Sequence, residues 1–387
     1  MNKKVLLGMS GGVDSSVSAI LLQKQGYEVI GATMRLWEDE KVEKENNEEN
    51  SENSKINKSE KTMDNSVDSS ISDAKKVCEK LGIEHHIFDL REEFKKRVVN
   101  NFICTYMCAK TPNPCVECNK FMKFDAFYKI AKELGCEYIA TGHYAKCFYS
   151  EEFKSYVLTK ADAEEKDQSY FLYGIDKEIL PHVIFPLSDF NNKEEIRKIA
   201  EENGLEVAKK KDSQEVCFIP DNDYIGFLRR EHAKDNENIM NDIKLKENIV
   251  SKNGNIVLSS GEVVGKHTGL VNYTVGQRKG LGVSYKEPLY VLKLDKEKNE
   301  VVVGIEKELY TDTLYANELN FLLNIEDINN LEIEAKIRYR AKPAKAILNV
   351  ENGIAKVKFY EEQRAITPGQ SVVFYLNNIV LGGGKII

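Results

Sequence analysis

Residues 4–15 read Lys4-Val5-Leu6-Leu7-Gly8-Met9-Ser10-Gly11-Gly12-Val13-Asp14-Ser15, and they decide the fold that the sequence predicts. A short apolar run leads into a turn of glycine and serine. Beyond the turn, apolar residues recur at the spacing of one helical face until Gly26, a residue type that commonly ends helices. This order of strand, turn and helix is typical of the first unit of a parallel sheet. Such sheets bind ligands at the carboxyl ends of their strands, where this turn lies.

The alternation of strands and helices continues through the first half of the chain. It is interrupted at about 38–72 by an acidic, polar segment that has too few apolar residues to offset the entropy of ordering, so we expect a mobile insertion there. From Glu287 onward, alternating segments predict an antiparallel sheet or small barrel. The further predicted strands are 28–34, 84–89, 138–141, 290–294, 300–303, 355–360 and 371–375, and the further predicted helices are 72–81, 90–107, 121–134 and 193–203.

These patterns predict an α/β protein of three domains, which suits a length of 387 residues. A doubly wound parallel-sheet domain is expected over 1–210, a small central domain over 211–286, and a C-terminal antiparallel β-barrel over 287–387. The first residues lack the apolar stretch of a signal peptide or membrane span, so we expect a cytoplasmic protein with no membrane partner. In a reducing compartment the eight cysteines would serve catalysis or metals rather than structural disulfides.

The net charge of −7 argues neither for nor against a nucleic-acid partner. Residues 38–73 contain 12 acidic residues and 5 lysines, so this segment carries the whole net charge and the rest of the chain sums to zero. Basic clusters at 209–211 and 338–345 are candidate contact surfaces for a nucleic acid, and are equally typical of solvated faces.

The turn after the first strand has the composition of an anion site. Gly11 and Gly12 lack a Cβ and let backbone N–H groups approach a phosphate, and serine hydroxyls add donors at a helix N-terminus. The turn matches neither the Walker A pattern, which ends in Gly-Lys-Ser/Thr, nor the dinucleotide fingerprint. It resembles the Ser-Gly-Gly-x-Asp-Ser loop of the ATP pyrophosphatases, which cleave ATP between the α and β phosphates and leave an adenylated substrate. The resemblance implies an ATP site, with Asp14 as the partner of Mg²⁺.

Further motifs extend the resemblance over nearly the whole chain. The most informative is residues 111–120 (Thr-Pro-Asn-Pro-Cys-Val-Glu-Cys-Asn-Lys). Its two prolines restrict the backbone, so we expect a stiff loop that does not form helix. Together these motifs are similar to those of the tRNA-specific 2-thiouridylases. The other motifs are residues 140–144, 166–172, 211–219, 273–282 and 367–370.

The resemblance implies that the enzyme adenylates the 2-oxygen of a tRNA uridine, at the wobble position, and replaces that oxygen with sulfur. Cys217 would carry the sulfur as a persulfide, and Cys118 would be the partner nucleophile that closes a transient disulfide with it. Lysines at 120, 123 and 209–211 are expected to lower the pKa of these thiols. The ATP-binding residues implied by the resemblance are Gly8, Met9, Ser10, Gly11, Gly12, Val13, Asp14, Ser15, Met34 and Gly142.

The same resemblance implies two macromolecular partners: the tRNA, and a cysteine desulfurase or sulfur-relay protein that supplies the persulfide. Arginine and tyrosine suit phosphates and flipped, stacked bases. The implied tRNA-binding residues are Asn113, Pro114, Cys115, His143, Lys166, Asp167, Gln168, Arg338, Tyr339 and Gln370.

One departure from the family raises a metal hypothesis. Many members carry an acidic residue where this chain has Cys115, which here creates a Cys-x-x-Cys pair with Cys118. Together with Cys217, these thiols would suffice for a [4Fe–4S] cluster with one open iron site. An alternative metal site would combine Cys104 and Cys108 with Cys115 and Cys118, because their sequence spacings lie within the range seen in zinc sites. Cys104 and Cys108 are equally typical of small apolar residues buried on a helix.

Two other functions remain open from the sequence. The chain could be another ATP pyrophosphatase, such as a 4-thiouridine synthetase or an amide-forming ligase, and a ligase would have no use for Cys118 and Cys217. It could also be a non-catalytic RNA-binding module that retains a nucleotide loop. Exchange between ATP and pyrophosphate that tRNA stimulates would separate an enzyme from such a module.

Overall fold

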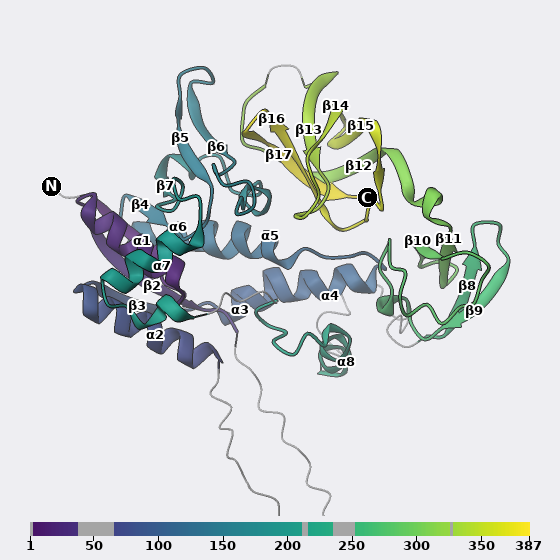
Figure 1. The fold of residues 1–387 in the computed structure, drawn as a ribbon, viewed down its shortest axis with the longest axis horizontal. Helices are drawn as coiled ribbons and strands as arrows, with labels where there is room; N and C mark the ends of the chain where they lie inside the picture. The colour runs from purple at the N-terminus through teal and green to yellow at the C-terminus, as the bar shows by residue number, and fades with distance from the viewer. Residues whose placement is uncertain (1–2, 38–65, 211–215, 235–251, 326–327) are drawn as a thin grey trace, which may run out of the picture.

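The computed structural model describes residues 3–37, 66–210, 216–234, 252–325 and 328–387. Residues 38–65 of the insertion expected at about 38–72 lie outside these ranges, as do residues 211–215 of the motif that contains Cys217. The expectation is wrong for residues 66–72, which form the start of a helix. Among the described residues, no helix combines the length and the apolar character needed to cross a membrane. The chain forms a parallel sheet with its helices, a small central sheet, and a C-terminal barrel (Figure 1).

A five-stranded parallel sheet in the order β3-β2-β1-β4-β7 forms the N-terminal part. The chain winds outward from β1 on both sides, which confirms the predicted doubly wound topology. Leu6 packs into the core on one face of the sheet, while Val5 and Leu7 pack into the core on the other, so this strand is apolar throughout. The strands are β1 (Lys4–Gly8), β2 (Glu28–Arg35), β3 (Glu84–Asp89), β4 (Tyr138–Ala140) and β7 (Val183–Ile184).

Helices cover both faces of this sheet. The core on one face contains residues of α1 (Val13–Lys24), α2 (Ser66–Leu81) and α7 (Lys193–Glu202). The core on the other face contains residues of α6 (Phe127–Glu133). Each of these helices is followed by the glycine predicted to end it, in the left-handed region; the glycines are Gly26, Gly82, Gly204 and Gly135.

Two long helical runs lead toward the rest of the molecule. The first is α3 (Arg91–Phe94), a π-helical turn (Lys95–Val99) and α4 (Asn100–Met107), as predicted for 90–107. The second is α5 (Pro114–Cys118), a π-helical stretch (Asn119–Ala126) and α6. The prediction that prolines keep residues 111–120 free of helix is therefore wrong from Pro114 onward. Proline is favoured at the first helical position, because its missing N–H would have no partner there.

The central sheet has the order β10-β11-β8-β9. Its strands are β8 (Gly254–Leu258), β9 (Val263–His267), β10 (Tyr290–Asp295) and β11 (Glu300–Gly304), and β8 pairs with β11 in parallel. This pairing corrects the expectation that the C-terminal sheet begins at Glu287, since β10 and β11 belong to the central sheet.

An aromatic cluster joins the central part to the N-terminal helices. Phe218 lies 5.3 Å from Phe102 of α4 and 5.4 Å from Phe227 of α8 (Tyr224–Lys234), measured between ring centroids. Trp37, at the end of the segment after β2, completes the cluster at 5.9 Å from Phe218. Phe218 follows Cys217 directly, so this packing fixes where the Cys217 segment lies.

The C-terminal part is an antiparallel barrel that the β12–β17 pairing closes. Inward residues such as Val357 and Phe374 are fully or almost fully buried, which fits the predicted alternation. A hairpin from the N-terminal half, β5 (Lys146–Ser150) and β6 (Ser155–Thr159), extends the sheet through a contact with β17. The barrel strands are β12 (Tyr310–Phe321), β13 (Leu331–Lys336), β14 (Ala344–Glu351), β15 (Ile354–Arg364), β16 (Ser371–Leu376) and β17 (Ile379–Ile386).

The barrel is tied to the helix that begins at Pro114. Lys385 of β17 lies 3.1 Å from the carboxylate of Glu117 in α5, whose side chain is almost fully buried, and 2.7 Å from that of Glu318. The Gln370 amide donates hydrogen bonds to the carbonyl oxygens of Thr111 (3.2 Å) and Pro112 (2.8 Å). The barrel therefore fixes the loop and the helix that contain Cys115 and Cys118.

We expect the substitution Lys385→Met to lower the free energy of unfolding by about 3 kcal/mol, because it leaves the buried carboxylate of Glu117 without its cation. Denaturant unfolding monitored by circular dichroism measures this change. Adding Glu117→Gln to Lys385→Met should restore part of the loss. Equal stabilities of the wild-type and Lys385→Met proteins would contradict the role given to this ion pair.

Candidate functional site

The turn between β1 and α1 has the geometry of a phosphate-binding loop. Gly11 adopts a φ of +68°, and a Cβ there would lie 2.3 Å from the carbonyl oxygen of Ser70 in α2, so only glycine fits. The hydroxyls of Ser15 and Ser16 donate to the Gly12 carbonyl at 3.1 and 2.8 Å. Ser10 is exposed at the edge of the turn. The loop is thus held from within and leaves its outer edge open to a ligand.

Asp14, the predicted magnesium partner, is the first acidic residue of α1. One carboxylate oxygen accepts a hydrogen bond of 2.9 Å from the Tyr144 hydroxyl, and the other lies 2.6 Å from the ammonium group of Lys193. These two contacts fix the orientation of the carboxylate next to the loop. Carboxylate oxygen is a ligand that Mg²⁺ accepts, so this residue fits the predicted role chemically.

The two predicted residues from neighbouring strands lie at strand ends. A Cβ on Gly142, just after β4, would lie 3.1 Å from Asp14 and 3.2 Å from the Ser15 backbone nitrogen, so this glycine lets the β4 end approach the loop closely. Met34 is half-buried near the end of β2, against the core of the opposite sheet face. The remaining predicted loop residues, Gly8, Met9 and Val13, are half-buried or buried and form its base.

Cys118 and Cys217 come from distant parts of the sequence and interact electrostatically. Cys118 is buried at the end of α5, in the core that also contains Phe218. Cys217 is open to solvent, yet enough protein surrounds its sulfur to raise the pKa of the thiol to about 12, to which Cys118 and then Cys115 also contribute. Burial likewise raises the pKa of Cys118 to about 11. The described cysteines are all free thiols.

Lysines were predicted to lower the pKa values of these thiols, but the net shift of each pKa is upward, so this prediction is wrong. Lys123 lowers the pKa of Cys115, Cys118 and Cys217 as predicted, but burial outweighs it at all three. Lys210 interacts with Asp73 and with the Gly11 carbonyl, and Lys211 lies outside the described residues. With pKa values of about 11 and about 12, Cys118 and Cys217 are protonated at neutral pH.

Alkylation of Cys217 should therefore follow an unusual pH profile. Since its pKa is raised to about 12, the thiolate fraction and the rate with iodoacetamide should rise about tenfold per pH unit from pH 7 to 10 without levelling off. Peptide mapping by mass spectrometry measures the rate at this one cysteine. The Lys123→Gln protein should react more slowly at each pH. A plateau near pH 9 would show an ordinary thiol instead.

Lys123 also connects the thiols to the nucleotide loop. Its charge acts on all three cysteines and on His143, whose pKa lies well below the usual value mainly because the ring is buried and secondly because of this charge. His143 follows Gly142, which contacts Asp14 of the loop. The charge of Lys123 thus acts both on the three cysteines and on a histidine next to the glycine that approaches the nucleotide loop.

Comparisons with known proteins show which family the chain is similar to. Residues 3–221 match the model of the tRNA methyl transferase HUP domain, residues 243–305 that of the tRNA methyl transferase PRC-barrel domain, and residues 311–386 that of the aminomethyltransferase beta-barrel domain. The tRNA-specific 2-thiouridylase MnmA of Clostridium botulinum (strain Alaska E43 / Type E3) is 46% identical over 99% of this chain and 98% of its own length. That of Clostridioides difficile (strain 630) is 42% identical over 100% of this chain and 98% of its own length.

The chain belongs to the tRNA-specific 2-thiouridylase family. Among solved structures, a complex described as a 4-thiouridine synthetase with RNA and bound ATP is 19% identical over 59% of this chain and 50% of that chain. Its TM-score of 0.33 is too low to carry an argument about this molecule.

The residues that this 2-thiouridylase family led us to assign to tRNA fall into two groups. Those at 166–168 and His143 lie around the loop after β4. Asp167 is buried and accepts hydrogen bonds from the backbone nitrogens of Ala161 and Ser169, and Gln168 accepts one from the Tyr144 backbone. The Lys166 ammonium lies 5.9 Å from the centre of the Tyr144 ring. These contacts organise the loop next to Asp14.

The second group consists of residues of the barrel and of the loop and helix that Gln370 contacts. Tyr339 packs against Phe171 with ring centroids 4.5 Å apart, and Arg338 donates to the Arg364 carbonyl at 2.9 Å. Gln370 bonds to the Thr111 and Pro112 carbonyls, so its amide positions the loop that contains Asn113. Asn113 and Pro114 are half-buried at the start of α5, and Cys115 is exposed.

The three thiols considered for a [4Fe–4S] cluster do not fit one as they are placed. Among the described residues, which include Cys115, Cys118 and Cys217, no three or more His, Cys, Asp or Glu side chains are gathered closely enough to hold a metal ion. The same holds for the rival zinc grouping with Cys104 and Cys108. Neither an iron–sulfur cluster nor zinc is part of the function that we propose.

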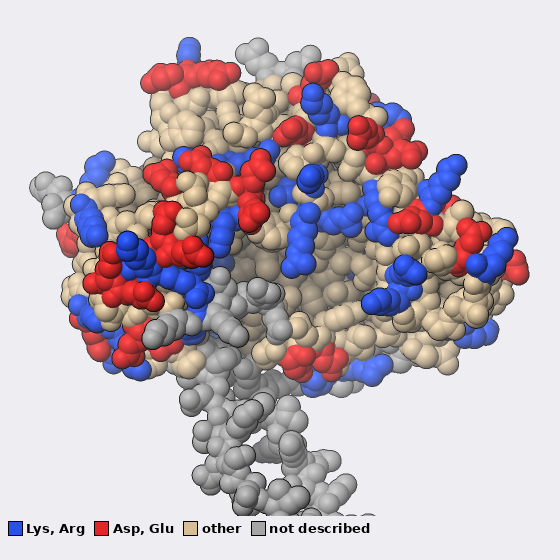
Figure 2. Space-filling model, viewed as in Figure 1, with Lys and Arg blue, Asp and Glu red and all other residues tan. Residues whose placement is uncertain are grey.

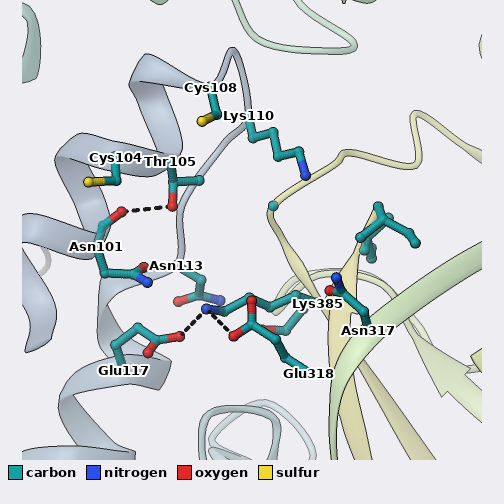
Figure 3. Close-up of a pocket in the computed structure, with 14 residues that line it drawn as sticks. Asn101, Cys104, Thr105, Cys108, Lys110, Asn113, Glu117, Asn317, Glu318 and Lys385 are labelled. Carbon is teal, nitrogen blue, oxygen red and sulfur yellow. Dashed lines mark hydrogen bonds and ion pairs between the residues drawn. The ribbon is translucent and has the colours of Figure 1, made fainter. Parts of the chain in front are cut away.

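A cavity of about 210 Å³ lies between α4, α5 and the barrel (Figure 3). Cys104 of α4 and Cys108, which directly follows α4, are among the residues that line it, and Lys385 reaches into it between Glu117 and Glu318. On the face of the molecule shown in Figure 2, Lys and Arg side chains gather around a hollow between the barrel and the N-terminal helices, which suits a polyanion such as tRNA.

Sequence reasoning assigned three residues near the nucleotide loop no role there, although Lys210 was considered for nucleic-acid contacts and for lowering the thiol pKa values. Lys193, Lys210 and Asp73 contact the loop or its carboxylate from positions far along the chain. Lys193 is the first residue of α7, and nothing in its spacing distinguishes it from an ordinary surface lysine. Only the packing of α7 against α1 brings it to Asp14.

Proposed function

We propose that this chain uses ATP to replace the 2-oxygen of the wobble uridine of a tRNA with sulfur carried on Cys217. Membership of the tRNA-specific 2-thiouridylase family supports the reaction class. The observation that carries the proposal is that the Cys217 segment packs beside Cys118: Phe218, the next residue, lies in the same core as Cys118, and Cys118 contributes to the raised pKa of Cys217. A pair of interacting thiols is what sulfur transfer needs, and neither an amide-forming ligase nor a methyl transferase would require it.

The first step makes the base reactive. The C2 carbonyl is part of a urea-like system and is a poor electrophile. Attack of its oxygen on the α-phosphate of ATP forms an adenylated base and releases pyrophosphate. The Gly11 and Gly12 turn would cradle the phosphates, and Mg²⁺ beside Asp14 would supply charge neutralisation there.

The second step transfers sulfur. The terminal sulfur of a Cys217 persulfide attacks C2, and the C2–O bond breaks, so AMP leaves with the original oxygen. The Cys118 thiolate then attacks the Cys217 sulfur and breaks the S–S bond, which releases 2-thiouridine and forms a Cys118–Cys217 disulfide. The two thiols supply the two electrons that reduce the persulfide sulfur. A dithiol reductant and a persulfide donor, such as a cysteine desulfurase or a sulfur-relay protein, must restore Cys217 for the next cycle.

The raised thiol pKa values give this scheme an inactive resting state. Cys118 is largely protonated at neutral pH until its surroundings change, for example when a base enters between it and Cys217. A persulfide is more acidic than a thiol, so charging Cys217 with sulfur itself creates the nucleophile.

The test is the reaction of purified protein with unmodified tRNA, Mg²⁺, ATP, cysteine and a cysteine desulfurase. Nucleosides from digested tRNA are separated and weighed by liquid chromatography and mass spectrometry. We expect 2-thiouridine that depends on ATP. Formation of 4-thiouridine, which has the same mass and a different retention time, or of a methylated uridine, would overturn the proposal.

A further inference from the structure

ATP needs positive charge around its β- and γ-phosphates, and the loop that would hold them contains none. Residues 8–15 include one ionisable group, the carboxylate of Asp14, which is negative. A Walker A loop meets this need with its own lysine, and this turn lacks one. Mg²⁺ alone leaves a bound triphosphate with net negative charge. A cation must therefore come from elsewhere in the fold.

The structure places two lysines at this loop from distant parts of the chain. The ammonium group of Lys193, at the start of α7, lies 2.6 Å from Asp14, and only 12% of its side chain is exposed. The ammonium group of Lys210 lies 3.3 Å from the Gly11 carbonyl and 2.8 Å from Asp73 of α2. α7 packs against α1, the helix that begins at the loop (Figure 1). One cation therefore contacts each end of the Gly11 to Asp14 turn.

Both lysines are held by carboxylates that a nucleotide would be able to replace. A lysine ammonium is a compact charge on a flexible four-carbon chain, so it can move from Asp14 or Asp73 to a nearby phosphate oxygen without movement of the backbone. The exchange costs little, because one charge-assisted hydrogen bond replaces another. It would also free an oxygen of Asp14 to bind Mg²⁺.

We propose that Lys193 and Lys210 bind the β- and γ-phosphates of ATP and stabilise the pyrophosphate that leaves, in the role that a Walker A loop gives to its own lysine. This inference rests on the proposed use of ATP. The lysines contact the part of ATP that AMP lacks. They should therefore distinguish ATP and pyrophosphate from AMP, which a purely structural ion pair would not do.

Isothermal titration calorimetry with Mg²⁺ measures the affinities of wild-type, Lys193→Met and Lys210→Met proteins for ATP, pyrophosphate and AMP. Each variant should lose about 10- to 100-fold in affinity for ATP and pyrophosphate, and less than about twofold for AMP. The Lys193→Arg protein should recover most of the ATP affinity, since it retains the charge. The matched control is Lys198→Met, on the same helix with a side chain that is 76% exposed.

The outcomes separate this inference from the function on which it rests. An equal loss for ATP and AMP, or no loss in either methionine variant, would overturn the role of the lysines while ATP-dependent thiolation by the wild type stood. Wild-type protein that binds no ATP would overturn both. If Lys193→Met unfolds because Asp14 is left unpaired, Lys210→Met and Lys193→Arg still decide the matter, since Lys210 contacts a different carboxylate.

Discussion

A Cys118→Ser protein is expected to trap tRNA covalently instead of releasing 2-thiouridine. In the proposed scheme the base is first joined to Cys217 through two sulfur atoms, and the Cys118 thiolate then breaks that link. Serine cannot do so, because an alkoxide is not available at neutral pH and does not exchange with disulfides. With persulfide-charged protein, ATP and tRNA, most of the tRNA should migrate with protein on a denaturing gel without reductant. Dithiothreitol should release it.

The matched variants make this result specific. Cys217→Ser should form no adduct and should lose at least about a thousandfold in thiolation rate, because the atom that carries sulfur is gone. Cys104→Ser changes another partly exposed thiol, on α4, and should behave as the wild type. Full activity of Cys118→Ser, or an adduct that survives in Cys217→Ser, would contradict the roles given to the two thiols.

The Gly11→Ala substitution is expected to disable the nucleotide loop. The new Cβ would lie 2.3 Å from the Ser70 carbonyl oxygen in a backbone conformation with φ of +68°. The left-handed conformation costs about 1–2 kcal/mol for alanine, and relieving the clash with the α2 backbone adds about 1–3 kcal/mol. We therefore expect about 2–5 kcal/mol less stability in denaturant unfolding, together with loss of measurable ATP binding.

Gly12→Ala is the control for the unfolding measurement. Its φ of −100° suits any residue, and a Cβ there would meet only the Ser10 hydroxyl oxygen at 3.4 Å. Its stability should stay within about 1 kcal/mol of the wild type. Similar losses in the two alanine variants would mean that the close approach of α2 to the loop is not what requires Gly11.

Local patterns in the sequence were sufficient to predict much of the first domain. The apolar run of β1 and the glycines after α1, α2, α6 and α7 are local signals, and β1 and the ends of these helices lie where they indicated. The start of α2 was misplaced, because the helix begins at Ser66, within the segment expected to be a mobile insertion. The helix from Pro114 was missed because proline breaks a helix inside it and favours one at its first position, and sequence alone did not place the start. The pairing of β11 with β8, which brings β10 and β11 into the central sheet, was missed because it depends on contacts between residues distant in sequence.

Only the site residues that belong to recognisable sequence motifs could be predicted. The turn at Ser10 to Ser15 and the two cysteines stand in recognisable stretches, whereas Lys193 and Lys210 meet the loop only through the packing of helices. The direction of the thiol pKa shifts was also beyond the sequence. Lys123 was correctly expected to lower these pKa values, but the stronger effect of burial depends on how the Cys217 segment packs against α4 and α5.

The most direct test of the account follows one sulfur atom. Protein charged at Cys217 with a single ³⁴S persulfide is mixed with tRNA and Mg-ATP without reductant, and nucleosides and peptides are weighed by mass spectrometry. The account predicts ³⁴S in 2-thiouridine, and a Cys118–Cys217 disulfide in equal amount. If 2-thiouridine forms while Cys118 remains a free thiol, or if ³⁴S stays on the protein while ATP is cleaved, the two cysteines do not act together as described.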